Sequence, residues 1–361
     1  MLAELGHFAL LLMVVTGIGQ AVLFSPLWIH SSLRMLRPQT STATPQGSPE
    51  LPDDDPVGVT GTVAKPANLF LLPAVILLLG LLAEGALLNA FIVSDFTLPV
   101  VTDVSHSSTP MLYRIGAAFT PDGGAMLVWL VALSLVNLLL ALQMGKSTKT
   151  GDDHFGRNAL SILGLLIAIL GVVTLIDADP FLRSSVAPLD GRGMNPQSQD
   201  LLKVLREPFL YLGLAGLAGI FALTLAGLLD RRIDRQLAET MRSWTIGSWV
   251  CLGTAIAINA YRSYSEQAWG GWWYWDTAEN SLLLPWLLAT ALLHCRAVLE
   301  KTETLRGWTA FLGITALAVG WFGVYLTRSG LFVPLPETQL LPSDSTGLLV
   351  SFCAVFAGAY Y

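Results

Sequence analysis

Eight stretches of the chain are apolar over about 20 residues, the length that a helix needs to cross the hydrocarbon core of a bilayer. They lie near residues 5–29, 68–93, 124–143, 158–177, 207–229, 244–263, 282–299 and 308–326. Only 13% of the 361 residues are charged and 53% are hydrophobic, which excludes an ordinary soluble domain. We therefore predict an all-α, polytopic integral membrane helix bundle with eight complete transmembrane helices.

A ninth apolar segment begins near Thr346 and continues to Tyr361. At about 16 residues it is short for a span, so we predict a partial ninth helix and a chain truncated at its C-terminal end. The N-terminus has no basic flank and no small-residue cleavage pattern, which predicts a retained first helix instead of a signal peptide.

The distribution of basic residues predicts the orientation. One set of alternate loops contains thirteen of the twenty Lys and Arg residues, and the other set contains seven. Because basic residues are enriched on the cytoplasmic side, we place the richer set there. The loops 94–123, 178–206 and 327–345, together with residues 265–281, then face the periplasm of a bacterial inner membrane.

Composition divides the chain into five segments. Residues 38–66 are rich in Pro, Thr, Ser, Gly and Asp, so we predict a disordered cytoplasmic linker. The others are the first transmembrane helix (1–37), a transmembrane bundle with periplasmic loops (67–264), a periplasmic segment (265–281) and the C-terminal helices (282–361). No basic tract points to nucleic acid, and the three cysteines lie in apolar stretches, where we expect buried thiols.

Four tryptophans and a tyrosine occupy the seven residues 269–275, between two apolar segments. Tryptophan is common at membrane interfaces, but two glycines in this run allow the backbone to fold tightly. We predict that these indoles form an aromatic shelf at the membrane surface, suited to a large, flat, apolar ligand. The alternative is that they only anchor the protein in lipid. The shelf residues are Trp269, Trp272, Trp273 and Trp275.

His294 lies deep in a strongly apolar segment that follows the shelf. Counting from Leu282 places it roughly 18 Å below the periplasmic end of its helix. An ionisable group at that depth is a functional candidate, and a neutral imidazole in an apolar bundle is a natural axial ligand for haem iron. The alternative is a histidine that hydrogen-bonds a neighbouring helix or lies near the cytoplasmic interface.

Two charged residues on the same side are further candidates. Asp276 follows the last tryptophan, where it either orients the polar edge of a ligand or caps the next helix. Arg328 ends the eighth predicted helix and pairs either with a propionate, as arginine does with carboxylates, or with a lipid headgroup. Gly213, Gly216 and Gly219 are spaced to permit close helix packing.

Several of these motifs resemble the CcmF/NrfE family of cytochrome c-type biogenesis proteins. Residues 4–10 resemble the opening of the family, residues 190–200 its GxGLNPxLQD loop, and residues 208–213 its PPLLYLGY helix start. Residues 269–280, WGGWWYWDTAEN, match the core of its WWD domain, and the TALLH of residues 290–294 follows. The resemblance covers essentially the whole chain but only about the N-terminal half of the family's length.

The resemblance implies a haem protein. His294 corresponds to one of two axial ligands of haem b, and the second ligand would come from another chain, because the family carries it on a later helix. The shelf and Asp276 correspond to the WWD platform, which receives a transient periplasmic haem from a CcmE-like haem chaperone. The other implied partners are apocytochrome c, other cytochrome c maturation subunits and a second polypeptide that completes the family fold.

The chain also departs from the family. Arg206 stands where the family has the first of two histidines that ligate the periplasmic haem, and Pro336 stands near the second. The family's HEG sequence reads Asp-Gly-Gly at residues 122–124. Neither arginine nor proline ligates iron, so the resemblance leaves aromatic stacking as the means of holding that haem.

From the resemblance we expect a CcmF-like protein that binds haem and takes part in its delivery and covalent ligation to apocytochrome c, as a haem lyase subunit forming thioethers. One alternative is a divergent, non-catalytic scaffold of the maturation complex. The other is a transporter of a different amphipathic ligand, for which only Glu84 and Asp230 offer acids within or beside a predicted span.

Overall fold

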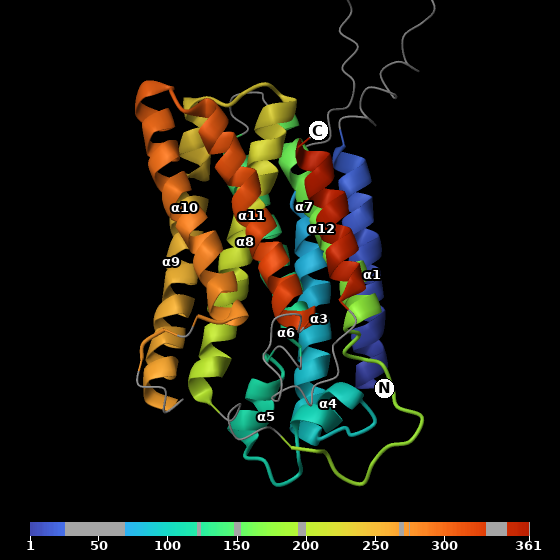
Figure 1. Cartoon of the computed structure of the whole chain (residues 1–361). Coiled ribbons are helices and arrows are strands. Elements are labelled where there is room, and N and C mark those ends of the chain that lie inside the picture. The colour runs from blue at the N-terminus through green and yellow to red at the C-terminus, as the bar shows by residue number, and fades with distance from the viewer. Residues whose placement is uncertain are drawn as a thin grey trace, which may run out of the picture.

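The computed structural model describes most of the chain, and all regular secondary structure in the described part is helical (Figure 1). The described residues are 1–25, 69–120, 124–147, 153–193, 200–266, 271–273, 275–329 and 345–360. The predicted linker 38–66 lies outside them. Trp269, Pro336 and Asp122 also fall outside the described residues.

Eight long helices form the bundle, one for each predicted apolar segment, and the predicted membrane fold is confirmed. They are α1 (Leu2–Phe24), α3 (Leu71–Val93), α6 (Ala125–Ser147), α7 (Asp153–Asp177), α8 (Leu201–Leu229), α9 (Arg235–Glu266), α10 (Thr277–Thr302) and α11 (Arg306–Ser329). A shorter helix, α12 (Thr346–Tyr360), is the predicted partial ninth.

Seven of the described helices are both long and apolar enough to cross a membrane, one fewer than predicted. The exception is α9, which has 32 residues but a lower mean hydropathy than the rest, because Ser, Thr, Gly and Asn interrupt its apolar sequence. It nevertheless packs along α8 on one side and α10 on the other. These neighbours give α9 partners for the polar residues that a lipid-facing helix would expose.

Polar and small residues hold the other half of the bundle together. Gln20 of α1 and Asn137 of α6 exchange two hydrogen bonds of 2.9 and 3.0 Å, and both side chains are fully buried. Gly17 and Gly164 allow α1 and α7 to approach closely, since a Cβ on Gly164 would lie 2.9 Å from the Gly17 carbonyl oxygen. Hydrocarbon gives helices no hydrophobic reason to associate, so such contacts specify the packing.

The predicted glycine contact between α8 and its neighbours is confirmed. A Cβ on Gly213 would lie 2.6 Å from Leu252 of α9, and one on Gly219 would lie 3.0 Å from Val136 of α6. Gly216 faces Ser248 of α9. The three glycines therefore bring α8 against two helices at once.

Two short helices and several loops gather at one end of the bundle (Figure 1). The short helices, α4 (Pro99–Val104) and α5 (Met111–Ala117), lie at this end with the N-terminus, whereas the α10–α11 connection lies at the opposite end. Asp177 of α7 accepts hydrogen bonds from the first amides of α12, which fixes where α12 begins. The described parts of the loops predicted to be periplasmic thus share one end, which also contains the described part of the shelf.

Candidate functional site

The aromatic shelf connects the end of α9 to the start of α10, at the end of the bundle that holds α4 and α5 (Figure 1). Three of its four predicted tryptophans, Trp272, Trp273 and Trp275, are described. Each helix supplies an anchor for the segment, because α9 continues to Glu266 and α10 starts at Thr277.

Trp272 stacks on a tyrosine that the sequence did not single out. Its ring lies 4.5 Å from that of Tyr264, on the last turns of α9, with an angle of 11° between the planes. Both side chains remain more than half exposed, at 56% for Trp272 and 52% for Tyr264. The pair therefore extends the aromatic surface from the loop onto α9, and it presents large apolar rings to the surroundings.

Trp273 and Trp275 form a second aromatic pair. Their ring centroids are 6.1 Å apart in an edge-to-face arrangement. Trp275 is the most exposed tryptophan among the described residues, at 76%, whereas the Nε1 of Trp273 is buried without a hydrogen-bond partner in the described part of the chain. Trp273 thus supports Trp275, whose ring is accessible to a ligand.

Asp276 caps α10, which is one of the two roles predicted for it. Its Oδ1 accepts a hydrogen bond of 2.7 Å from the Glu279 amide, and its backbone carbonyl accepts one of 2.8 Å from the Asn280 side chain. Such a cap satisfies amides that the first turn of a helix leaves unpaired. Because Asp276 directly follows Trp275, the cap also fixes the point at which the shelf joins α10.

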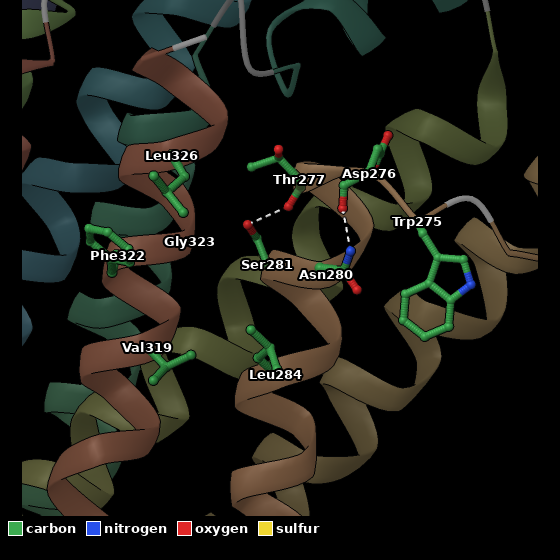
Figure 2. Close-up of a pocket in the computed structure, with 10 residues that line it drawn as sticks. All are labelled: Trp275, Asp276, Thr277, Asn280, Ser281, Leu284, Val319, Phe322, Gly323 and Leu326. Carbon is green, nitrogen blue, oxygen red and sulfur yellow. Dashed lines mark hydrogen bonds between the residues drawn. The ribbon is translucent and has the colours of Figure 1, made fainter. Parts of the chain in front are cut away.

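A pocket of about 510 Å³ opens beside Trp275, between the first turns of α10 and the last turns of α11 (Figure 2). That volume falls within the range of roughly 300–1,000 Å³ typical of sites for cofactors and other small ligands. The lining residues are Trp275, Asp276, Thr277, Asn280, Ser281, Leu284, Val319, Phe322, Gly323 and Leu326.

The pocket has a polar end and an apolar wall. In Figure 2 the polar side chains of Asp276, Thr277 and Ser281 lie at the start of α10, and the apolar Leu284 lies farther along that helix. Gly323 permits the close approach of α11 at this level, since a Cβ there would lie 2.8 Å from the Cβ of Ser281. The pocket therefore suits an amphipathic ligand that also contacts Trp275.

His294 lies on the outer face of α10 instead of facing the core. Its side chain is exposed, and Leu284, Leu287 and Val298 are exposed on the same helix at spacings that place them in one stripe with it. The opposite stripe of α10, which includes Leu292 and Arg296, is buried. Within the described chain, His294 therefore has no position in the bundle core.

The depth predicted for His294 is corrected by the length of α10. The helix begins at Thr277, five residues before Leu282, and ends at Thr302. At 1.5 Å per residue, His294 is about 26 Å from the first residue of α10 and about 12 Å from the last. His294 is consequently farther from both ends of its helix than the predicted limits 282 and 299 implied.

Arg328 lies in the last turn of α11, at the shelf end of the bundle. Its side chain is half-buried. Arg328 does not belong to the residues that line the pocket, although Leu326 does. The structure thus brings Arg328 to the predicted end of the molecule without placing it against Trp275.

Arg206, at a position where the resemblance led us to look for a ligand, forms an ion pair. Its Nη2 lies 3.2 Å from Glu207 Oε1, and its Nη1 donates a 3.0 Å hydrogen bond to Asn259 of α9. No group of three His, Cys, Asp or Glu residues suitable for a metal ion occurs among the described residues. The described part of the site therefore offers an aromatic surface and no cluster of metal-ligating side chains.

The sequence missed Tyr264 and the wall that α11 contributes to the pocket. A tyrosine near a helix end at a membrane surface is ordinary, and only its position within two turns of the shelf could have drawn attention to it. Val319, Phe322 and Leu326 gave no signal, since their relation to α10 depends on how the helices pack.

Comparisons with known proteins agree on one family. A family model described as Cytochrome C assembly protein matches residues 123–332. The cytochrome c-type biogenesis protein ccl1 of Rhodobacter capsulatus is 35% identical over 92% of this chain and 46% of its own length. CycK of Rhizobium meliloti is 32% identical over 100% of this chain and 48% of its own length. CcmF of Escherichia coli is 33% identical over 76% of this chain and 42% of its own length.

A solved structure described as Cytochrome c Heme Lyase CcmF has the same fold, with a TM-score of 0.71 at 23% identity. The similarity covers the whole of this chain and 51% of the solved one. The chain thus spans about half the length of the curated relatives it matches. These findings confirm the resemblance inferred from the WWD motif and its flanking sequences.

Proposed function

Because the chain belongs to the cytochrome c assembly protein family, we propose that it binds haem at the aromatic shelf and takes part in delivering haem to apocytochrome c. The observation that carries this proposal is the pair of exposed indoles, Trp272 and Trp275, of which Trp275 lines a pocket with an apolar wall. Exposed aromatic rings of this size are unfavourable in water unless a ligand or a membrane covers them.

The described residues fit a porphyrin ring but not its iron. Trp272 and Trp275 provide flat apolar surface. The pocket that Trp275 lines can accommodate the amphipathic edge of the porphyrin. No histidine occurs among the described residues of the shelf and the pocket lining. Bound haem supplies the vinyl groups and the iron chemistry that thioether formation needs, while the protein supplies position and the exclusion of water.

His294 is our candidate for an axial ligand of a second, stable haem b. Its outward position on α10 supports a haem shared with another polypeptide, because an exposed imidazole among leucines is otherwise left in lipid. The curated relatives are about twice as long as this chain, so their additional length is the natural source of the second ligand. We place this haem between α10 and a helix outside the chain.

The proposed setting is a bacterial inner membrane with the shelf at the periplasmic surface. The basic residues favour this orientation, since thirteen of the twenty lie in or near the connections on the opposite side. We propose a CcmE-like haem chaperone as the donor and apocytochrome c as the acceptor. Covalent ligation would then be performed together with other maturation subunits.

A titration with two porphyrins tests the proposal. The full chain is placed in lipid nanodiscs and titrated with haemin and with metal-free protoporphyrin IX, and quenching of tryptophan fluorescence is recorded. We expect both to bind with affinities within about threefold of each other, because stacking does not require iron. Binding of neither compound would contradict the proposed function. Binding of haemin alone would show that a ligand to iron holds it.

The second candidate function is that of a scaffold that does not bind haem, and the contacts of Arg206 favour it. The guanidinium is paired with Glu207 and hydrogen-bonded to Asn259, so the position is committed to the structure of the bundle. Such a scaffold would bind maturation subunits but no porphyrin. The titration separates the two candidates, since protoporphyrin quenches the tryptophan fluorescence of a haem-binding protein but not that of a scaffold.

A further inference from the structure

A buried polar network lies where α8, α9 and α10 meet below the shelf. Its central residues are Arg206, Asn259 and Glu279, and their side chains are 13%, 3% and 5% exposed. Burying charge is unfavourable unless every charged group is paired and hydrogen-bonded. A network of this kind within a membrane helix bundle therefore points to a specific use.

The contacts run without interruption from α8 to α10. Arg206 Nη1 donates to Asn259 Oδ1 at 3.0 Å, and Asn259 Nδ2 donates to Glu279 Oε1 at 3.0 Å. Ser263, one turn farther along α9, donates to the same carboxylate oxygen at 2.7 Å. Asn259 thus uses both ends of its amide, and two donors from α9 fix the carboxylate of Glu279.

A second ion pair strengthens the α8–α9 side of this junction. Arg262 Nε lies 2.9 Å from Asp200 Oδ2, and Asp200 is itself the N-cap of α8, since it accepts a hydrogen bond from Leu202. The last turns of α9 are therefore held against the first turns of α8. Those turns of α9 carry Tyr264, the stacking partner of Trp272.

The network connects directly to the shelf through Glu279. Its side chain is held by α9, and its backbone amide donates the 2.7 Å hydrogen bond to Asp276, which follows Trp275. A displacement of Glu279 therefore moves the cap of α10 and the tryptophan before it. Both ends of the aromatic segment are anchored to the same set of buried contacts.

We propose that Arg206, Asn259 and Glu279 are positioning residues that hold the shelf in the geometry that accepts a planar porphyrin. The inference rests on the proposed haem-binding function. A loop that is already ordered loses less conformational entropy when a ligand binds, and this preorganisation raises affinity. The three residues act through Asp276 and Tyr264 and do not touch the ligand.

A double-mutant cycle tests this arrangement in the full chain in nanodiscs, with haemin affinity as the measurement. Asn259→Leu removes the link between α8 and α10, and Arg206→Met removes its far end. We expect each single variant to bind haemin about tenfold more weakly. The double variant should be no weaker than Asn259→Leu alone, because the hydrogen bonds that lead from Arg206 to Glu279 pass through Asn259.

Two further variants separate positioning from general loss of stability. Asn137→Leu breaks the equally buried Gln20–Asn137 pair on the other side of the bundle, so it should lower thermal stability while leaving haemin affinity unchanged. Glu279→Gln keeps an oxygen that accepts the bonds from α9 and should retain most of the affinity, whereas Glu279→Leu should not.

The outcomes are distinct from those that test the shelf itself. If Asn259→Leu binds haemin like the unmodified chain while removal of Trp272 and Trp275 weakens binding, the shelf is the binding surface and the positioning role is wrong. Additive losses for Arg206→Met and Asn259→Leu would also overturn it. If the variant without Trp272 and Trp275 binds normally, the proposed function fails and this inference fails with it.

Discussion

Tyr264 and Trp272 stack at 4.5 Å although one belongs to α9 and the other to the loop that follows it. The clustering of four tryptophans within seven residues was enough to predict the loop part of this surface. The tyrosine was not predicted, because a single aromatic residue at a helix end is typical of any membrane protein. The contact between the two rings depends on tertiary structure, which the sequence did not reveal.

His294 shows a different limit of the sequence. Its depth in an apolar segment marked it as a candidate, but depth does not say which side of a helix a residue occupies. Its direction follows from the buried stripe of α10, which includes Leu282, Ala289 and Leu292. An outward imidazole supports the proposal, already made from the resemblance, that a partner supplies the second ligand.

Replacing His294 with alanine tests that assignment. The chain is co-expressed with the other maturation subunits of its organism, and the reduced-minus-oxidised spectrum of the purified complex is recorded. We expect the b-type haem signal to be lost, because one of two axial ligands is removed.

His7→Ala is the matched control, since His7 is a half-exposed histidine near the start of α1 that pairs with Asp179. It should leave the spectrum unchanged. A full haem signal in the His294→Ala complex would exclude His294 as a ligand.

At the level of helices, the apolar windows located all eight long elements but placed the starts of six of them too late. The α8 helix begins at Leu201, six residues before the predicted start at 207. The intervening Arg206 was interpreted as part of a loop, yet it is buried by its pairing with Glu207. A hydropathy window counts both charges against a helix and does not register that Arg206 pairs with the adjacent Glu207 and donates to Asn259 of α9.

The close contact of α1 with α7 provides a prediction for stability. A side chain on Gly164 would meet the Gly17 carbonyl oxygen at 2.9 Å and the Ala21 amide nitrogen at 3.0 Å. Gly164→Leu should therefore force the helices apart and lower the free energy of unfolding by about 1–3 kcal/mol. Thermal unfolding in detergent micelles measures the change.

Gly19→Leu on α1 is the matched control, because no atom lies within 4 Å of a Cβ at that position. It should unfold at the temperature of the unmodified chain or slightly above, since leucine is the better helix former. Equal destabilisation by both substitutions would show that the α1–α7 contact is not what the Gly164 substitution disturbs.

For the molecule as a whole, the alternation of apolar segments and loops predicted which loops lie at the same end of the helix bundle. The structure places α4, α5 and the shelf at one end and the α10–α11 connection at the other (Figure 1). It does not place the membrane, so the sidedness of the chain depends on the count of basic residues.

Labelling of single cysteines tests the sidedness. In a chain whose three native cysteines are replaced by serine, Leu189→Cys lies in an exposed loop at the shelf end and Thr304→Cys at the α10–α11 connection. A membrane-impermeant maleimide should label Leu189→Cys in spheroplasts and Thr304→Cys only after permeabilisation. The reverse pattern would place the shelf in the cytoplasm.

The central claim is that the indoles of the shelf bind porphyrin and do more than anchor the protein in lipid. Trp308 offers a matched control, because it is 61% exposed and lies at the opposite end of the bundle, near the start of α11. The decisive measurement is the haemin affinity of the Trp272→Leu/Trp275→Leu variant against that of Trp308→Leu, both in nanodiscs. At about 0.5–1.5 kcal/mol for each stacked ring, the first variant should bind roughly 5- to 150-fold more weakly and the second unchanged. Equal affinities for the two variants would contradict the account.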